Sequence, residues 1–124
     1  MTRAGGAGDP ARLTIDEALA RLPGPDGKRF ALLYSHGSLE VEVFAPLGRD
    51  DQTPHTRDEI YVIMRGTGTF SIAGTRRPFG PGDFLFAAAG VEHRFEDFTD
   101  DFATWVFFYG PEGGEADRGP GARG

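Results

Sequence analysis

Short hydrophobic runs recur along most of the chain and are separated by turns rich in glycine and proline. The clearest run is residues 39–44, in which three apolar positions alternate with Glu40 and Glu42. A period of two is typical of a strand with one buried face. We therefore expect both glutamates on the solvated face, with a pocket-facing position for one of them as the alternative. Strands that recur about every ten residues are typical of an all-β sandwich or barrel.

The same kind of pattern predicts the other strands. The expected strands are residues 30–34, 39–44, 60–64, 69–72, 84–87, 93–95 and 102–109. Residues 35–38 form the turn between the first two strands. Residues 80–83 predict a type II turn, because Pro81 fits its second position and Gly82 its third.

A short helix is expected before the first strand, over residues 14–22. Thr14 and Glu17 have the spacing of a capping box, and Pro23 with Gly24 ends the helix. A second stretch is ambiguous, since residues 53–66 could form a helix with proline at its first turn. We favour a strand there, because β-branched and aromatic residues dominate and a glycine-containing hairpin follows.

Composition limits the classes of protein that fit. At 124 residues the chain has room for one domain, expected over residues 13–110, with disordered glycine- and proline-rich ends at residues 1–12 and 111–124. A net charge of −6 without a basic stripe argues against nucleic-acid binding. No apolar stretch is long enough to span a membrane, and the N-terminus lacks a signal-peptide core. With no cysteine, a metal could be held only by nitrogen and oxygen, and we expect a cytoplasmic protein.

Two of the three histidines stand where a metal site would need them. His55 precedes the apolar run 60–64, Glu59 opens it, and His93 follows a turn near the end of the chain. Two imidazoles and one carboxylate suit a divalent first-row metal with open coordination positions. Four residues of straight strand span about 13 Å, so residues 56–58 must bend if His55 and Glu59 are to share one ion. The three ligands would then meet inside a closed or nearly closed barrel.

Strand alternation extends this site to its surroundings. If Glu59 points inward, Tyr61 and Ile63 do so as well, and an inward His93 brings Phe95 with it. Ile63 and Phe95 would then be walls of a mostly apolar pocket, and Tyr61 could donate a proton. The acidic residues between 95 and 102 form an exposed loop or rim the pocket, where they would disfavour anionic substrates.

The chain from about residue 39 to residue 109 resembles the cupin superfamily of small β-barrels. The first cupin motif contains His-X-His, then Glu and Gly, and His55, Glu59 and Gly66 match it in spacing. Thr53 stands at the first His position, and Gly48 lies near the start of the motif, one residue off the usual spacing of its first glycine. In the second motif the matching residues are Gly82, Gly90 and His93, with Ala88 in place of Pro and Asp97 in place of Asn.

This resemblance implies a double-stranded β-helix, the cupin-like jelly-roll barrel, with a metal at His55, Glu59 and His93. Because Thr53 departs from the motif, the fourth ligand is Gln52, through its amide oxygen, or water. Iron or manganese is favoured, and zinc or nickel suits the same ligands.

Three functions follow from the resemblance. The first is a small metal-dependent enzyme of dioxygenase, isomerase, lyase or cyclase type that acts on a small metabolite, preferably neutral or carbonyl-bearing. The second is a small-ligand-binding module without turnover, in which the metal is structural or absent. The third is an assembly protein with phenylalanine-rich strands. Cupins form dimers through strand exchange, so the resemblance implies a homodimer in each case.

Overall fold

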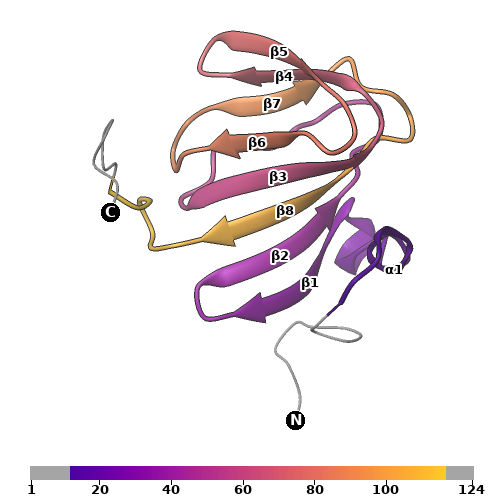
Figure 1. Cartoon of the computed structure of the whole chain (residues 1–124), viewed down its shortest axis with the longest axis horizontal. Coiled ribbons are helices and arrows are strands. Elements are labelled where there is room, and N and C mark those ends of the chain that lie inside the picture. Colours follow the sequence, from indigo (N-terminus) through magenta and orange to yellow (C-terminus); the bar gives the residue numbers. More distant parts are fainter. Residues whose placement is uncertain (1–11, 117–124) are drawn as a thin grey trace.

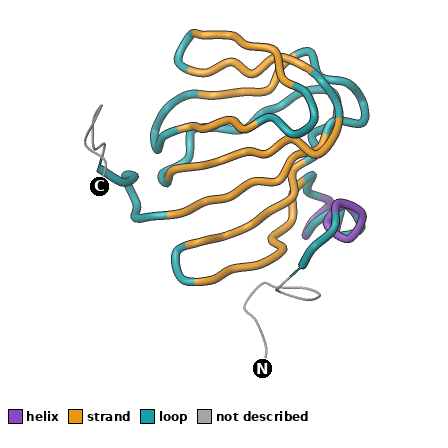
Figure 2. The backbone as a smooth tube through the Cα atoms, viewed as in Figure 1, coloured by secondary structure: helices purple, strands orange, loops and turns teal. Residues whose placement is uncertain are grey.

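The computed structural model of the protein describes residues 12–116. Figures 1 and 2 show an all-β body with one short helix beside it. In chain order the elements are α1 (Ile15–Leu19), a 3₁₀ turn (Pro25–Gly27), β1 (Phe30–His36), β2 (Leu39–Phe44), β3 (Asp58–Arg65), β4 (Gly68–Ile72), β5 (Thr75–Phe79), β6 (Phe84–Ala87), β7 (His93–Glu96) and β8 (Ala103–Tyr109). The predicted class, all-β with a short N-terminal helix, is confirmed.

The strands form two antiparallel sheets that share one interior. The larger sheet has the order β1-β2-β8-β3-β6, and the smaller has the order β5-β4-β7. One core cluster joins both sheets, because Tyr61 and Val106 from the larger sheet pack with Phe70, Phe79 and Phe95 from the smaller one. Several of these rings meet edge to face or tilted, as in the pair Tyr61–Phe95 with centroids 4.8 Å apart.

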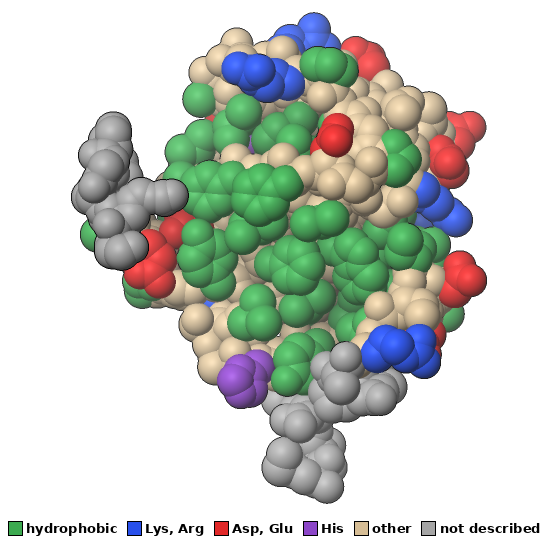
Figure 3. Space-filling view, in the orientation of Figure 1, with side chains coloured by type: hydrophobic (Ala, Val, Ile, Leu, Met, Phe, Trp, Pro, Cys, Tyr) green, Lys and Arg blue, Asp and Glu red, His purple; other side chains and the backbone are tan. Residues whose placement is uncertain are grey.

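The outer face of the larger sheet carries a second core cluster. Leu33, Val43 and Ala103 are almost fully buried there, and Leu19 of α1 packs against them. The capping box of this helix is present, with the Thr14 hydroxyl accepting from the Glu17 amide at 3.1 Å. Figure 3 shows hydrophobic side chains gathered over β6, β3, β8 and β2 on this face.

The structure corrects several of the element bounds that the sequence predicted. β1 continues through His36, so the turn is only residues 37–38. The helix covers residues 15–19 rather than 14–22. Residues 53–57 are not helical and β3 begins at Asp58, so the strand interpretation was the right one. The structure also has a strand that was not predicted from the sequence, β5.

Two glycines are required by the backbone. Gly82 has φ +85° at the third position of the predicted turn, where the Asp83 amide donates to the Gly80 carbonyl. Gly66, between β3 and β4, has φ +90°, and a Cβ there would lie 2.5 Å from the Cα of Phe102. Both glycines are among those that match the two motifs.

The expected disordered ends lie mostly outside the described residues, which exclude 1–11 and 117–124. Residues 111–116 are described, and two of their amides form hydrogen bonds with the body of the domain. The Gly113 amide donates to the Thr56 carbonyl, and the Glu115 amide donates to the Asp58 carboxylate at 2.8 Å. This segment therefore lies against the start of β3. Among the described residues no helix has the length and apolar character that crossing a bilayer requires.

Candidate metal centre

His55 and Glu59 come together because the chain bends where β3 begins. Residues 56–57 form the bend, and strand pairing starts at Asp58. The Gly90 amide donates to the His55 carbonyl at 2.7 Å, and the Asp58 carboxylate accepts from the Ala89 amide at 3.0 Å. The loop that leads to His93 is thereby tied to the bend that carries His55. This is the bend that the distance argument from the sequence required.

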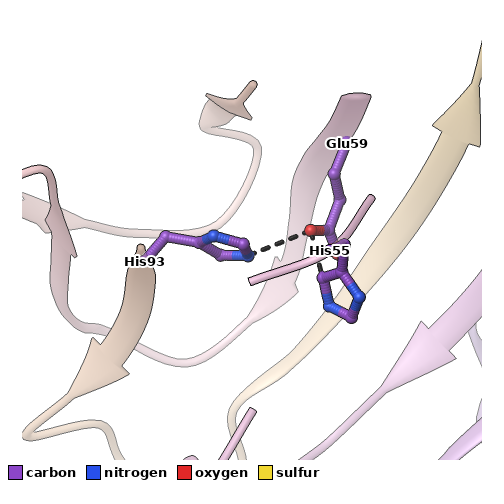
Figure 4. A group of neighbouring side chains, drawn as sticks. All are labelled: His55, Glu59 and His93. Carbon is purple, nitrogen blue, oxygen red and sulfur yellow. Dashed lines mark ion pairs between the residues drawn. The ribbon is translucent and has the colours of Figure 1, made fainter. Parts of the chain in front are cut away.

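Figure 4 shows the side chains of His55, Glu59 and His93 directed toward one another. Oε1 of Glu59 lies 3.0 Å from Nε2 of His93 and 3.7 Å from Nε2 of His55. One donor atom from each of the three residues lies within 4.8 Å of the others. Glu59 and His93 are each 2% exposed, whereas His55 is partly open to solvent. The triad is therefore buried on one side and accessible on the other.

The hydrogen bonds of His93 leave a lone pair facing Glu59. Its Nδ1 lies 2.8 Å from the carbonyl oxygen of Val91, which can only accept, so Nδ1 carries the hydrogen. Neutral His93 then has an unprotonated Nε2, aimed at a Glu59 oxygen that has no hydrogen-bond partner although it is buried. Two acceptors at 3.0 Å repel each other unless a proton or a cation lies with them. His55, Glu59 and His93 are positioned to hold a metal ion.

The pKa of His93 reflects this need for positive charge. Burial favours the neutral ring and lowers the pKa, but the contact with Glu59 and the hydrogen bond to Val91 outweigh it, so the pKa is raised above its usual value. A proton thus stabilises the pair when no cation does.

Two further side chains, Gln52 and Tyr61, contribute oxygen atoms beside the triad. Oε1 of Gln52 lies 3.3 Å from Nε2 of His55, and the Tyr61 hydroxyl donates to that same oxygen at 3.2 Å. The buried carboxylate of Asp50 accepts from the amide nitrogen of Gln52 at 2.6 Å, which turns the amide oxygen toward the triad. Asp50, whose buried carboxylate fixes the position of Gln52, was not singled out from the sequence.

Tyr61 also contacts the second histidine, with its hydroxyl 3.0 Å from Nε2 of His93. Burial, followed by the charge of Glu59, raises the pKa of Tyr61 well above its usual value. Its hydroxyl therefore keeps its proton and remains a hydrogen-bond donor at neutral pH.

An open cavity of about 660 Å³ extends from His55 and Glu59 across the inner face of the larger sheet. Its apolar lining includes Phe44, Val106 and Phe108 of the sheet, together with Phe30, Pro46 and Leu47. Ile63 and Phe95 are nearly fully buried in the core and do not line this cavity, so the pocket-wall assignment needs correction. They point to the same interior as the triad, but Ile63 lies further along β3 and Phe95 on the opposite sheet.

Charged residues also line the cavity, in places that the sequence did not indicate. Glu42 lines it, so the expectation of a solvated face was wrong for this residue. Burial, then the charges of Glu40 and Glu59, raise the pKa of Glu42 to about 7. Lys28 and Arg29 line the cavity, whereas the acidic residues 96–101 do not. The cavity is therefore not rimmed by that acidic loop.

A small antiparallel barrel with two histidines and a glutamate gathered inside it defines the class of protein. The chain belongs to the cupin family, because the model of the Cupin domain matches residues 40–109. The cupin-type barrel that the resemblance implied is therefore confirmed.

Comparison with individual proteins gives relatives of the same kind. An uncharacterized protein of Streptomyces coelicolor, SCO3923, is 30% identical over 100 residues, which cover 79% of this chain and 94% of the relative. The crystal structure of a Cupin 2 conserved barrel domain protein from Salinispora arenicola has 23% identity and a TM-score of 0.57, covering 65% of this chain and 74% of that one. The DMSP lyase DddQ from Ruegeria pomeroyi has 29% identity and a TM-score of 0.57, covering 80% of this chain and 55% of the lyase.

Proposed function

We propose that the protein is a metal-dependent cupin enzyme that acts on a small metabolite. The observation that carries this proposal is the pair of buried acceptors, Oε1 of Glu59 and Nε2 of His93, at 3.0 Å. A structural ion pair would not need an open cavity beside it, yet one of about 660 Å³ begins at His55 and Glu59. A cavity that can bind a small molecule therefore adjoins a group of residues that can react with it.

The residues that would hold the metal are His55, Glu59 and His93, with the Gln52 amide oxygen as a fourth ligand. Support for Gln52 comes from its carbonyl oxygen, which lies 3.3 Å from His55 and is fixed by the hydrogen bond to Asp50. Nitrogen and oxygen donors favour iron or manganese, and zinc or nickel suits the same set. A bound divalent cation would supply Lewis-acid polarisation of a carbonyl, or a site for oxygen chemistry.

The chain's own residues would bind and orient the substrate. Phe44, Val106 and Phe108 exclude water from one side of the molecule, and the protonated Tyr61 hydroxyl donates beside the metal ligands. We retain Tyr61 as a candidate proton donor on this basis.

The donor set suits dioxygenase, isomerase, lyase and cyclase reactions. Among these we favour proton-transfer chemistry of lyase or isomerase type over oxygenation. The similarity to the DMSP lyase DddQ supports this choice, as does the acidic Glu42 in the cavity. The chain spans only 55% of that lyase, so its substrate is not carried over.

A second candidate is a binding module without turnover. It is favoured by Thr53, which stands where the cupin motif has its first histidine, so that one nitrogen ligand is absent. In this case the cavity would capture a small molecule and the metal would be structural or missing.

Metal analysis of purified protein tests the first proposal. We expect about one metal ion per chain after reconstitution, and none in His93→Ala, because the buried pair loses its nitrogen donor. His36→Ala is the matched control, since His36 lies exposed at the end of β1, and it should bind metal as the wild type does. Wild-type protein that holds no metal after reconstitution with iron, manganese, zinc or nickel would favour the binding module.

We also propose that the protein is a homodimer, with a second copy covering the outer face of the larger sheet. Phe84 and Phe86 of β6 are 64% and 42% exposed, beside Ile60 and Val62 of the paired strand β3. Such an exposed apolar face is typical of an association surface. We expect Phe84→Glu to elute as a monomer in size-exclusion chromatography with light scattering, whereas Leu47→Glu, a control 63% exposed, stays dimeric. Monomeric wild type at micromolar concentration would contradict the dimer.

A further inference from the structure

Glu42 is a carboxyl group of the cavity that has no hydrogen-bond or ion-pair partner within residues 12–116. Its side chain lines the same cavity as His55 and Glu59. Neither a hydrogen bond nor an ion pair joins it to any residue between 12 and 116. Glu40, two residues earlier on β2, is by contrast paired with Arg57 at 3.0 Å. Of the two glutamates, Glu42 is thus the one left to interact with a ligand.

Strand register gives the position of Glu42 relative to the triad. Glu42 pairs with Val106 of β8, and Val106 pairs with Tyr61 of β3. The backbones of Glu42 and Tyr61 are therefore two strand spacings apart, about 10 Å. Both side chains point to the interior, and the charge of Glu59 is near enough to act on Glu42. A molecule at the triad would lie within reach of Glu42.

The environment keeps Glu42 ready to exchange a proton near neutral pH. In the metal-free protein, burial and the charges of Glu40 and Glu59 raise its pKa to about 7. The other charged or titratable residues that line the cavity are His55, Lys28, Arg29, Arg49, Asp50 and Asp51. An acid–base group works best when both of its forms are populated at the working pH.

Two cations of the cavity lining, Lys28 and Arg29, lie across the sheet from the triad, in a cavity that Arg49, Asp50 and Asp51 also line. Lys28 and Arg29 stand before β1, which is three strand spacings, or about 14 Å, from β3 across the sheet. Arg29 donates through Nε to the Ala45 carbonyl. Within the described part of the chain, neither cation forms an ion pair. An anionic group of a ligand would compensate this charge.

We propose that Glu42 is the acid–base residue of the cavity and acts on a small oxo acid. This inference rests on the proposed metal-dependent function. The carbonyl of this substrate lies at the triad, and its carboxylate lies toward Lys28 and Arg29. The Glu42 carboxylate takes a proton from the carbon next to the carbonyl. The electron pair of the broken C–H bond forms a C=C bond, and the displaced C=O pair moves onto oxygen. Return of a proton from Glu42 to carbon completes the exchange without an oxidant or co-reactant.

The test follows hydrogen exchange in levulinate, whose carbonyl and carboxylate are separated by two carbons. Zn²⁺-loaded protein in D₂O should exchange the hydrogens beside the carbonyl, as seen by proton NMR. We expect Glu42→Gln to slow this exchange at least about 100-fold, and Glu42→Asp to retain part of it. Glu40→Gln, the matched control outside the cavity lining, should stay within about threefold of wild type. Lys28→Met should raise the half-saturating levulinate concentration about threefold.

A second readout uses the metal-free protein. Carbon-13 NMR of labelled glutamate should reveal one carboxyl that titrates near pH 7 and is absent from Glu42→Gln but present in Glu40→Gln. Failure of the wild type to bind Zn²⁺ would overturn the proposed metal function and with it this inference. Zn²⁺ bound with no exchange above buffer, or equal exchange in Glu42→Gln, would overturn the inference alone. Titration of Glu42 below pH 5 would do the same.

Discussion

The two faces of the five-stranded sheet are built by the same strands and carry opposite chemistry. On β2, Val41 and Val43 face the outer cluster beneath α1, while Glu42 between them faces the cavity. On β3, Glu59 and Tyr61 point inward to the triad. The outer face is apolar, and the inner face carries the carboxylates of Glu42 and Glu59 and the phenol of Tyr61 among apolar side chains.

This difference separates stability from function within single strands. Burying an apolar side chain on the outer face stabilises the fold, whereas burying a carboxylate inside costs free energy unless a cation or proton compensates it. Burial of the Glu59 and Glu42 carboxylates therefore costs folding free energy. Changes on the inner face should therefore alter ligand binding while sparing the fold, and changes on the outer face should do the reverse.

The largest expected effect is on metal affinity in Glu59→Gln. Removing the only carboxylate of the triad should weaken metal binding by more than about 100-fold. At a pH that leaves His93 neutral, the metal-free variant should be as stable as wild type or more so, because a buried carboxylate without a compensating positive charge is gone. Chelator competition measures the affinity, and thermal unfolding with EDTA measures the stability. Equal metal affinity in variant and wild type would remove Glu59 from the ligand set.

On the outer face, Leu33→Ala tests the opposite behaviour. Leu33 is 1% exposed in the outer cluster, and truncating such a leucine costs about 3 kcal/mol of unfolding free energy. Urea denaturation should register this loss, while the folded variant still binds one metal per chain. Leu47→Ala, at a site 63% exposed, should change stability by less than about 0.5 kcal/mol. Loss of metal from folded Leu33→Ala would show that the two faces are coupled.

The bend at the start of β3 shows why much of the site could be predicted from sequence. Bond lengths and strand rise together require a bend between His55 and Glu59, whatever the details of the loop. Strand alternation then correctly predicted that Tyr61, Ile63 and Phe95 point inward. These rules are local, so a single sequence carries them.

The position of Glu42 could not be predicted from the sequence. Alternation on β2 separates two faces, but it does not say which one meets water, because a barrel can turn its polar face to an internal cavity. Asp50 was missed for a related reason. Its partners Gln52 and Phe95 lie in the same loop and on a distant strand, and only the folded chain brings them together. The ordered residues 111–116 depend in the same way on a contact with Asp58.

The smallest expected effect is a pH-dependent change in the free energy of unfolding. It tests whether the side chain of Glu42 lies on the inner face in solution. The pKa of Glu42 rises from 4.5 when unfolded to about 7 when folded. Between these values the folded chain holds a proton that the unfolded chain has released, so stability falls as pH rises through this window. Glu42→Gln has no such loss. It should therefore gain about 1–2 kcal/mol over wild type between about pH 4.5 and pH 8, less than the full shift because the carboxyl is partly exposed. Urea unfolding of metal-free protein at both pH values gives this difference. Glu40→Gln, which keeps the Glu42 carboxyl, should still lose stability with rising pH, over a somewhat lower and narrower range because the charge of Glu40 no longer raises the pKa of Glu42. If the unfolding free energies of wild type and Glu42→Gln depended on pH in the same way, Glu42 would be solvent-exposed in the folded protein. The triad would then be the reactive group of the inner face.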